Sequence, residues 1–180
     1  MIQLYRAMDT IVRAIWRAFA GRRNASVAPT GARILPAYAA LARYHAHTTD
    51  LEPRLRLLVT QLAAERSRCR WCIERGRHEW REAHLALDQL CALLRYETSP
   101  LFSPRDKAAL RFADAVTRYR DDMSVEPLSR ARQHLSEPEI VAVTAAVAAE
   151  HFFNPITGAL GADVSAWGAP IGSSIRSLWL

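Results

Sequence analysis

Two helix-starting motifs limit the possible folds of this chain more than any other feature of its sequence. Ser136-Glu137-Pro138-Glu139 is a capping box ahead of an apolar run from Ile140 to about Phe153. Ser103 and Pro104 supply a cap and a first-turn proline for a helix whose apolar stripe is Leu110, Phe112, Ala113, Val116 and Tyr119. No segment alternates with a sustained period of two, so the sequence predicts an all-α fold.

The same spacing predicts further helices at 35–47, 53–67, from the segment around Cys69 onward, and at 85–96 and 125–135. A chain of 180 residues fits one domain with a sizeable core. We expect a single helical domain over 32–165, preceded by an amphipathic helix and linker over 1–31 and followed by an apolar tail over 166–180.

The N-terminal segment imitates a signal peptide, but Asp9, Arg13 and Arg17 interrupt the apolar core that such a peptide requires. We expect an amphipathic helix that packs on the domain or on a neighbouring subunit. A helix lying on a membrane surface is the alternative.

Charge and cysteine content exclude several classes of function. The net charge of +6 comes from arginines, since Lys107 is the only lysine, and these alternate with acidic residues as on a solvated helix face. No nucleic-acid-reading motif accompanies them, so we expect no nucleic-acid partner. Charged residues also interrupt every long apolar run, which predicts no transmembrane segment. Three cysteines without an export signal indicate reduced thiols in a cytoplasmic protein.

The segment ERSRCRWCIERGRHEW holds the chemistry of the chain. Cys69 and Cys72 lie three residues apart at the start of a helix, where they can approach closely enough for a disulfide. The helix N-terminus and several nearby arginines favour a thiolate. Two alternatives stay open: a zinc site completed by His84 and Cys91, and two cysteines that only fill a helix interface.

The segment EPRLRLLVTQLAAERSRCRWCIERGRHEW resembles the CxxC region of the carboxymuconolactone decarboxylase and alkylhydroperoxidase D-like family. The likeness continues in DKAALRFADAVT and LSEPEIVAVTAAVAAEHFFNPITGALG, so it covers about residues 35–164. It implies an all-helical homo-oligomer, a trimer, hexamer or dimer, that reduces organic hydroperoxides as an antioxidant enzyme without a cofactor. It also implies that Cys72 attacks the peroxide, that Cys69 resolves the product to a disulfide, and that a protein or small-molecule thiol serves as reductant.

The chain departs from that family at the proton relay. The alkylhydroperoxidase members carry a histidine four residues after the second cysteine and a glutamate twelve before the first, where this chain has Gly76 and Leu57. Glu65 is a candidate base if the helix before Cys69 continues or turns tightly, and His78 is one if the next helix is locally distorted. Glu79 is a weaker candidate, two turns beyond Cys72.

Other residues are open to two interpretations. His151 is expected to line the pocket or to make an interhelical hydrogen bond, and Cys91 to be buried in the core. Trp71 and Trp80 are expected in a substrate pocket, the core or an interface. The missing relay leaves two further functions open: a redox-sensing or binding oligomer without efficient turnover, and a lyase of the carboxymuconolactone decarboxylase type.

Overall fold

The structure, a computed structural model, describes residues 37, 40, 41, 43, 44, 50–118 and 125–159. The predicted N-terminal helix and C-terminal tail lie outside these residues. Within them the chain forms helices and no strand, as predicted. The helices are α4 (Pro53–Ser67), α5 (Arg70–Glu82), α6 (Leu87–Ala92) with the 3₁₀ turn η1 (Leu93–Arg95), α7 (Pro104–Arg118), α8 (Val125–Ala131) and α9 (Glu137–Ala159).

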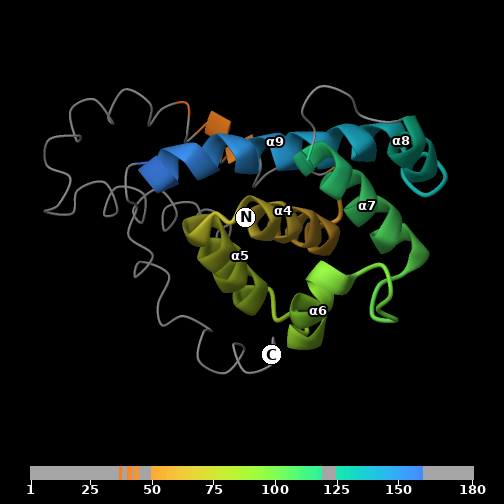
Figure 1. Cartoon of the computed structure of the whole chain (residues 1–180), viewed down its shortest axis with the longest axis horizontal. Helices are drawn as coiled ribbons and strands as arrows, with labels where there is room; N and C mark the ends of the chain where they lie inside the picture. Colours follow the sequence, from red (N-terminus) through yellow and green to blue (C-terminus); the bar gives the residue numbers. More distant parts are fainter. Residues whose placement is uncertain (1–36, 38–39, 42, 45–49, 119–124, 160–180) are drawn as a thin grey trace, which may run out of the picture.

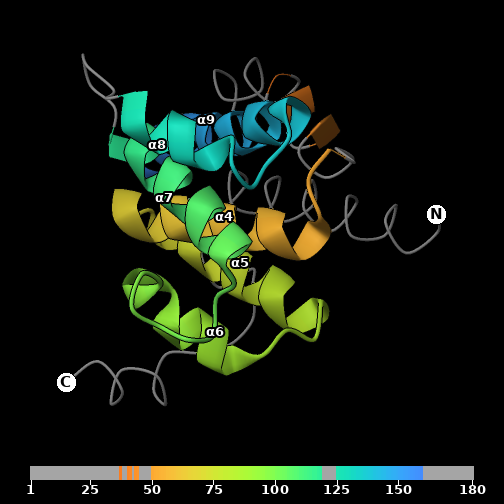
Figure 2. The ribbon, with the colours of Figure 1, turned by 90° about the vertical axis from the view of Figure 1, so that its right-hand side faces the viewer.

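The helix α4 forms the centre of the fold because most of its circumference is apolar. It packs against α5, α7 and α9, and lies between α9 on one side and α5 with α6 on the other (Figures 1 and 2). Its fully buried side chains include Leu55, Leu58, Val59 and Leu62. Pro53 stands in the first turn, where a missing N–H costs nothing.

Both predicted helix starts are present. Ser103 and Asp106 cap α7 reciprocally, the Asp106 N–H donating to Ser103 Oγ at 3.1 Å and the Ser103 N–H to Asp106 Oδ2 at 3.0 Å. At α9, Glu139 Oε2 accepts from the backbone N–H of Ser136 at 2.8 Å. These contacts satisfy donors that a helix N-terminus otherwise leaves unpaired.

The helix α9 runs further than the sequence predicts, passing through Pro155 to Ala159. Proline removes one backbone donor from the helix. Beyond it, the Thr157 hydroxyl donates to the carbonyl oxygens of Phe153 and Asn154. These bonds satisfy carbonyls of the last turns. The extension brings Thr157 into the site described below.

Residues Glu137–Thr157 of α9 are long and apolar enough to pass for a membrane-spanning helix. Half of that stretch is buried inside the domain, where α9 packs on α4 and α7. The core helix of a protein fold requires the same composition, so the packing of α9 accounts for its apolar character.

We predict a pH-dependent contribution of Glu139 to stability. Its hydrogen bonds from Arg105 and from the Ser136 backbone lower its pKa from 4.5 to about 2, against a smaller opposing effect of burial. A depressed pKa stabilises the fold above the unfolded-state pKa, and this stabilisation is lost as the pH falls toward the folded-state pKa. Glu139→Gln should therefore lower the free energy of unfolding at neutral pH by about 1 kcal/mol, since the group is partly exposed.

Urea denaturation from neutral pH down to about pH 2 checks this. The difference between Glu139→Gln and the wild-type protein should shrink between about pH 4.5 and pH 2. Glu137→Gln, which changes an exposed carboxylate bonded to Arg132, is the matched control and should have a smaller effect. A difference that is constant over the whole pH range would contradict the prediction.

Candidate active site

A sharp turn between α4 and α5 places the two cysteines. Arg68 adopts the left-handed conformation, with φ 55° and ψ 31°, and its N–H donates to the carbonyl oxygens of Ala64 and Glu65. The Cys69 N–H then donates to Ala64 O at 3.2 Å. These bonds end α4 and set Cys69 as the N-cap of α5, so α4 does not continue into the CxxC motif.

Cys69 and Cys72 form a disulfide in this structure, with their Cα atoms 5.2 Å apart. Both are buried, with 4% and 1% of their surface exposed. Cys69 Sγ accepts the Cys72 N–H at 3.2 Å and lies 3.5 Å from the Thr157 hydroxyl. A backbone donor and the positive end of the helix dipole therefore both act on the Cys69 sulfur, which favours its thiolate after reduction.

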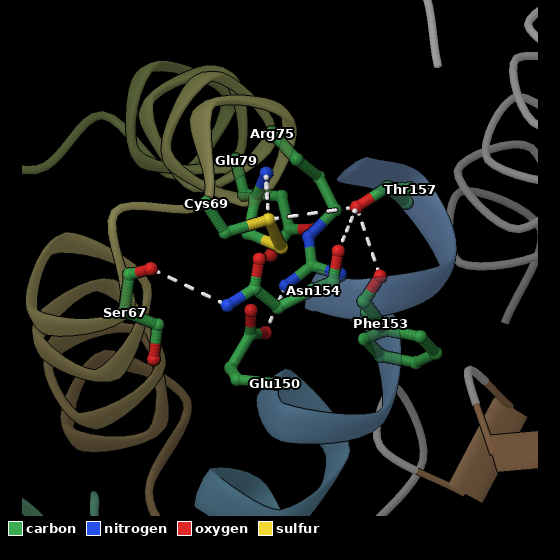
Figure 3. The surroundings of a disulfide bond; sticks show 9 residues. Ser67, Cys69, Arg75, Glu79, Glu150, Phe153, Asn154 and Thr157 are labelled. Atoms are coloured by element: carbon green, nitrogen blue, oxygen red, sulfur yellow. Dashed lines mark hydrogen bonds and ion pairs between the residues drawn. A yellow bond between two sulfur atoms is a disulfide. The ribbon is translucent and has the colours of Figure 1, made fainter. Parts of the chain in front are cut away.

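One face of α9 supplies polar groups around the disulfide. Glu150, Asn154 and Thr157 follow one another at helical spacing, and Figure 3 shows them gathered beside the cysteine pair. The Asn154 amide Nδ2 donates to Ser67 O at 3.3 Å, which holds the end of α4 against α9. The site is therefore built by three helices, α4, α5 and α9.

A buried ion pair joins α5 to α9 next to the cysteines. Arg75, one turn after Cys72, donates through Nη2 to Glu150 Oε1, and the two residues have 6% and 1% of their surface exposed. The Arg75 guanidinium carbon lies 5.5 Å from the Trp71 ring centroid and 5.3 Å from that of Phe153, within cation–π range. Burial raises the pKa of Glu150 above its ordinary value, and the charge of Arg75 opposes this rise.

Sequence reasoning missed both members of this pair. Glu150 is the single carboxylate in the apolar run 140–153, and a lone charge in a buried helix is a recognisable signal. Arg75 carried no comparable signal, because it is one of several arginines around the CxxC motif.

Glu65 lies half-buried near the end of α4. Its Oε1 accepts from Gln61 Nε2 at 2.9 Å and from Arg77 Nη2 at 3.2 Å. Within the described part of the chain, the hydrogen bonds of Glu65 thus go to these residues and not to a cysteine. Its carboxylate joins α4 to α5.

His78 and Glu79 lie on α5. This helix is continuous from Arg70 to Glu82, without the local distortion that would bring His78 toward Cys72, so His78 stays about 120° round the helix from Cys72. The Glu79 carboxylate lies 3.5 Å from Arg75 Nε and faces the disulfide region (Figure 3).

The space beside Gly76 holds the side chain of Gln61. A Cβ atom at position 76 would overlap Gln61 Oε1 and lie 3.2 Å from its Cδ. Gln61 is buried, and its Oε1 has no hydrogen-bond partner among the described residues. Gly76 and the Gln61 side chain from α4 therefore fit together, and a larger side chain at position 76 would compete with Gln61 for the same space.

Several other expectations are settled by burial. His151 is exposed, so the expectation that it lines the pocket is wrong, because α9 turns Glu150 and Asn154 inward and His151 to solvent. Trp80 is buried in the core and donates to Ala86 O at 3.1 Å. Cys91 is only half-buried and has a free thiol.

In the described ranges no three His, Cys, Asp or Glu side chains gather as a metal site, and His84 is exposed.

We predict that the effect of Gly76→Ala depends on Gln61. With Gln61 present, the added methyl group should lower the free energy of unfolding by about 1–3 kcal/mol through overpacking. In a Gln61→Ala background the same change should raise it by up to about 1 kcal/mol, since alanine favours a helix more than glycine does.

Chemical denaturation of the four variants in this double-mutant cycle measures the coupling. A stabilising Gly76→Ala in both backgrounds would show that Gln61 does not occupy the space beside position 76.

Comparison with known proteins supports the fold. No protein-family model and no curated protein matches the chain. A protein of unknown function from Agrobacterium tumefaciens, provisionally assigned as the antioxidant defence protein AhpD, superposes with a TM-score of 0.70 and 25% identity over 76% of this chain and 93% of its own. The debrominase Bmp8 superposes with a TM-score of 0.71 and 16% identity over 95% of this chain and 89% of its own.

A variant of Bmp8 in complex with 2,3,4-tribromopyrrole is similar at 15% identity, with a TM-score of 0.67, over 84% of this chain and 77% of its own. The Bmp8 likenesses show the fold alone. Together with the Agrobacterium tumefaciens protein they establish that this chain has the AhpD-like all-α fold.

Proposed function

We propose that this protein is a dithiol oxidoreductase that reduces organic hydroperoxides, with Cys69 and Cys72 as its redox pair. The observation that carries the proposal is the position of the pair: two cysteines at bonding distance, at the N-terminus of α5 and enclosed by the polar face of α9. The AhpD assignment of one fold neighbour supports the same chemistry.

The reaction is a two-electron exchange between two thiols and one peroxide. The Cys72 thiolate attacks the terminal peroxide oxygen, the O–O bond breaks, and the alkoxide takes up a proton to leave as an alcohol. The Cys69 thiolate then attacks the sulfur of the Cys72 sulfenic acid, and hydroxide leaves with a proton as water. The disulfide is the oxidised product, and the hydroperoxide has been reduced to alcohol and water.

The N-cap contact supports this division of roles. The Cys72 N–H donates to Cys69 Sγ, so the helix N-terminus stabilises a Cys69 thiolate. Such a thiolate is the attacking group in the resolving step and the better leaving group when an external thiol reduces the disulfide at Cys72. A protein or small-molecule thiol reductant closes the cycle, which fits a cytoplasmic protein.

A second function, a redox sensor that forms its disulfide stoichiometrically, is favoured by the burial of both cysteines and by the glutamine beside Gly76. The two functions differ in turnover. A peroxidase consumes many equivalents of hydroperoxide when a dithiol reductant is supplied, whereas a sensor reacts once and is reduced slowly.

We predict that the single cysteine variants separate the roles of the two thiols. Cys72→Ser should lose the fast reaction with cumene hydroperoxide, because the attacking thiol is gone. Cys69→Ser should react once and keep a sulfenic acid at Cys72 that dimedone traps. Stopped-flow fluorescence and intact mass measure the two outcomes.

Cys91→Ser is the matched control and should react like the wild-type protein, since this half-buried thiol lies outside the disulfide. A fast reaction that survives in Cys72→Ser and disappears in Cys69→Ser would reverse the roles. A wild-type rate no higher than that of a free thiol would refute the proposed function.

A further inference from the structure

Glu150 is a buried carboxylate, and one of its two oxygens accepts no hydrogen bond from the described residues. Arg75 binds its Oε1, while Oε2 has no hydrogen-bond partner among the described residues. Only 1% of the residue surface is exposed. Buried polar atoms are nearly always satisfied, and an exception calls for an explanation. A free carboxylate oxygen in a buried site is a place where a proton can be bound.

Glu150 also lies on the side of α9 that faces the dithiol. One turn further along the same face is Asn154, and a further turn on is Thr157, whose hydroxyl lies 3.5 Å from Cys69 Sγ. Figure 3 shows the Glu150 side chain pointing from α9 toward Asn154 and the disulfide. Its partner Arg75 lies one turn after Cys72 on α5. The ion pair therefore holds Glu150 beside the helix that carries the two cysteines.

The thiol cycle requires one group to move protons. The Cys72 thiol must lose a proton before it attacks, and the alkoxide must gain one as it leaves. The relay residues expected from the family are replaced by Leu57 and Gly76. Glu65 is bound by Gln61 and Arg77, and His78 is turned away from Cys72.

We propose that Glu150 is the proton carrier of this reaction, its Oε2 taking the proton from the Cys72 thiol and returning it to the alkoxide released from the hydroperoxide. The inference rests on the proposed function. The protons balance, because the carboxylate is protonated when the thiolate forms and is ionised again when the alcohol leaves. Arg75 is a positioning residue, which holds the carboxylate through Oε1 and leaves Oε2 available.

Burial supports this role. Desolvation raises the pKa of Glu150, and the positive charge of Arg75 opposes this rise. The negative charge of Glu79, which lies beside Arg75, raises the pKa of Glu150 further. A carboxyl group whose pKa is moved toward neutrality both accepts and releases a proton under working conditions.

The test compares a reaction that needs a proton donor with two that do not. Reduced wild-type protein and Glu150→Gln are mixed with tert-butyl hydroperoxide, with peracetic acid and with iodoacetamide, and modification of Cys72 is followed by stopped flow and peptide mass. An alkoxide needs a proton to leave, whereas acetate and iodide leave as stable anions. Glu150→Gln should slow the hydroperoxide reaction by about 100-fold or more, because it loses both the base and the proton donor. The other two reactions lose only the base that forms the Cys72 thiolate, so they should slow by a clearly smaller factor.

Two further variants distinguish a loss of proton transfer from a loss of structure at the site. Glu150→Asp keeps an acid and a partner for Arg75, so it should fold even if Glu150→Gln does not. Its shorter reach should slow the hydroperoxide reaction more than alkylation. Glu74→Gln, which changes a carboxylate of α5 bonded to Arg77, is the matched control and should keep the wild-type rates.

The outcomes are distinguishable. Equal slowing of all three reagents, or no slowing of any, would overturn the role of Glu150 and leave the proposed function intact. A wild-type protein that reacts with tert-butyl hydroperoxide no faster than a free thiol would overturn the proposed function and, with it, this inference.

Discussion

The buried ion pair between Arg75 and Glu150 is the interaction on which the arrangement of the site depends. It joins α5, which carries the cysteines, to α9, which lines them. Removing one partner of such a pair commonly costs about 3–5 kcal/mol, because the other charge is left buried and alone. Two well-packed apolar side chains in the same place would often stabilise a fold at least as much as the ion pair does. Stability alone therefore does not account for the two charges beside the dithiol.

The sequence predicted the parts of the fold that depend on local signals. The bounds of α4, the capping residues at Ser103 and Ser136, and the start of a helix at the CxxC motif all follow from caps, proline positions and apolar spacing. The passage of α9 through Pro155 was not predicted, because a proline inside an apolar run usually ends or kinks a helix. Nor was the partner of Arg75, since residues 75 apart meet only through tertiary packing.

The site shows why the same fold supports different chemistry. A histidine at position 76 would need the space that Gln61 fills, so Gly76 and the glutamine on α4 are matched to each other. The expectation for His151 failed for a related reason, since one position along α9 separates a buried carboxylate from an exposed imidazole. The fold is shared with a protein provisionally assigned to antioxidant defence and with a debrominase, so the helices alone do not identify the reaction, and the side chains between them decide it.

If Cys69 and Cys72 work as one dithiol, a hydroperoxide removes both of their thiols together, and a thiol count with intact mass detects this. Reduced protein is measured before and after one equivalent of an organic hydroperoxide. We expect its three thiols to fall to one within the fast phase, with a mass loss of about 2 Da. A mass gain of oxygen without loss of a second thiol, or no rapid change at all, would contradict it.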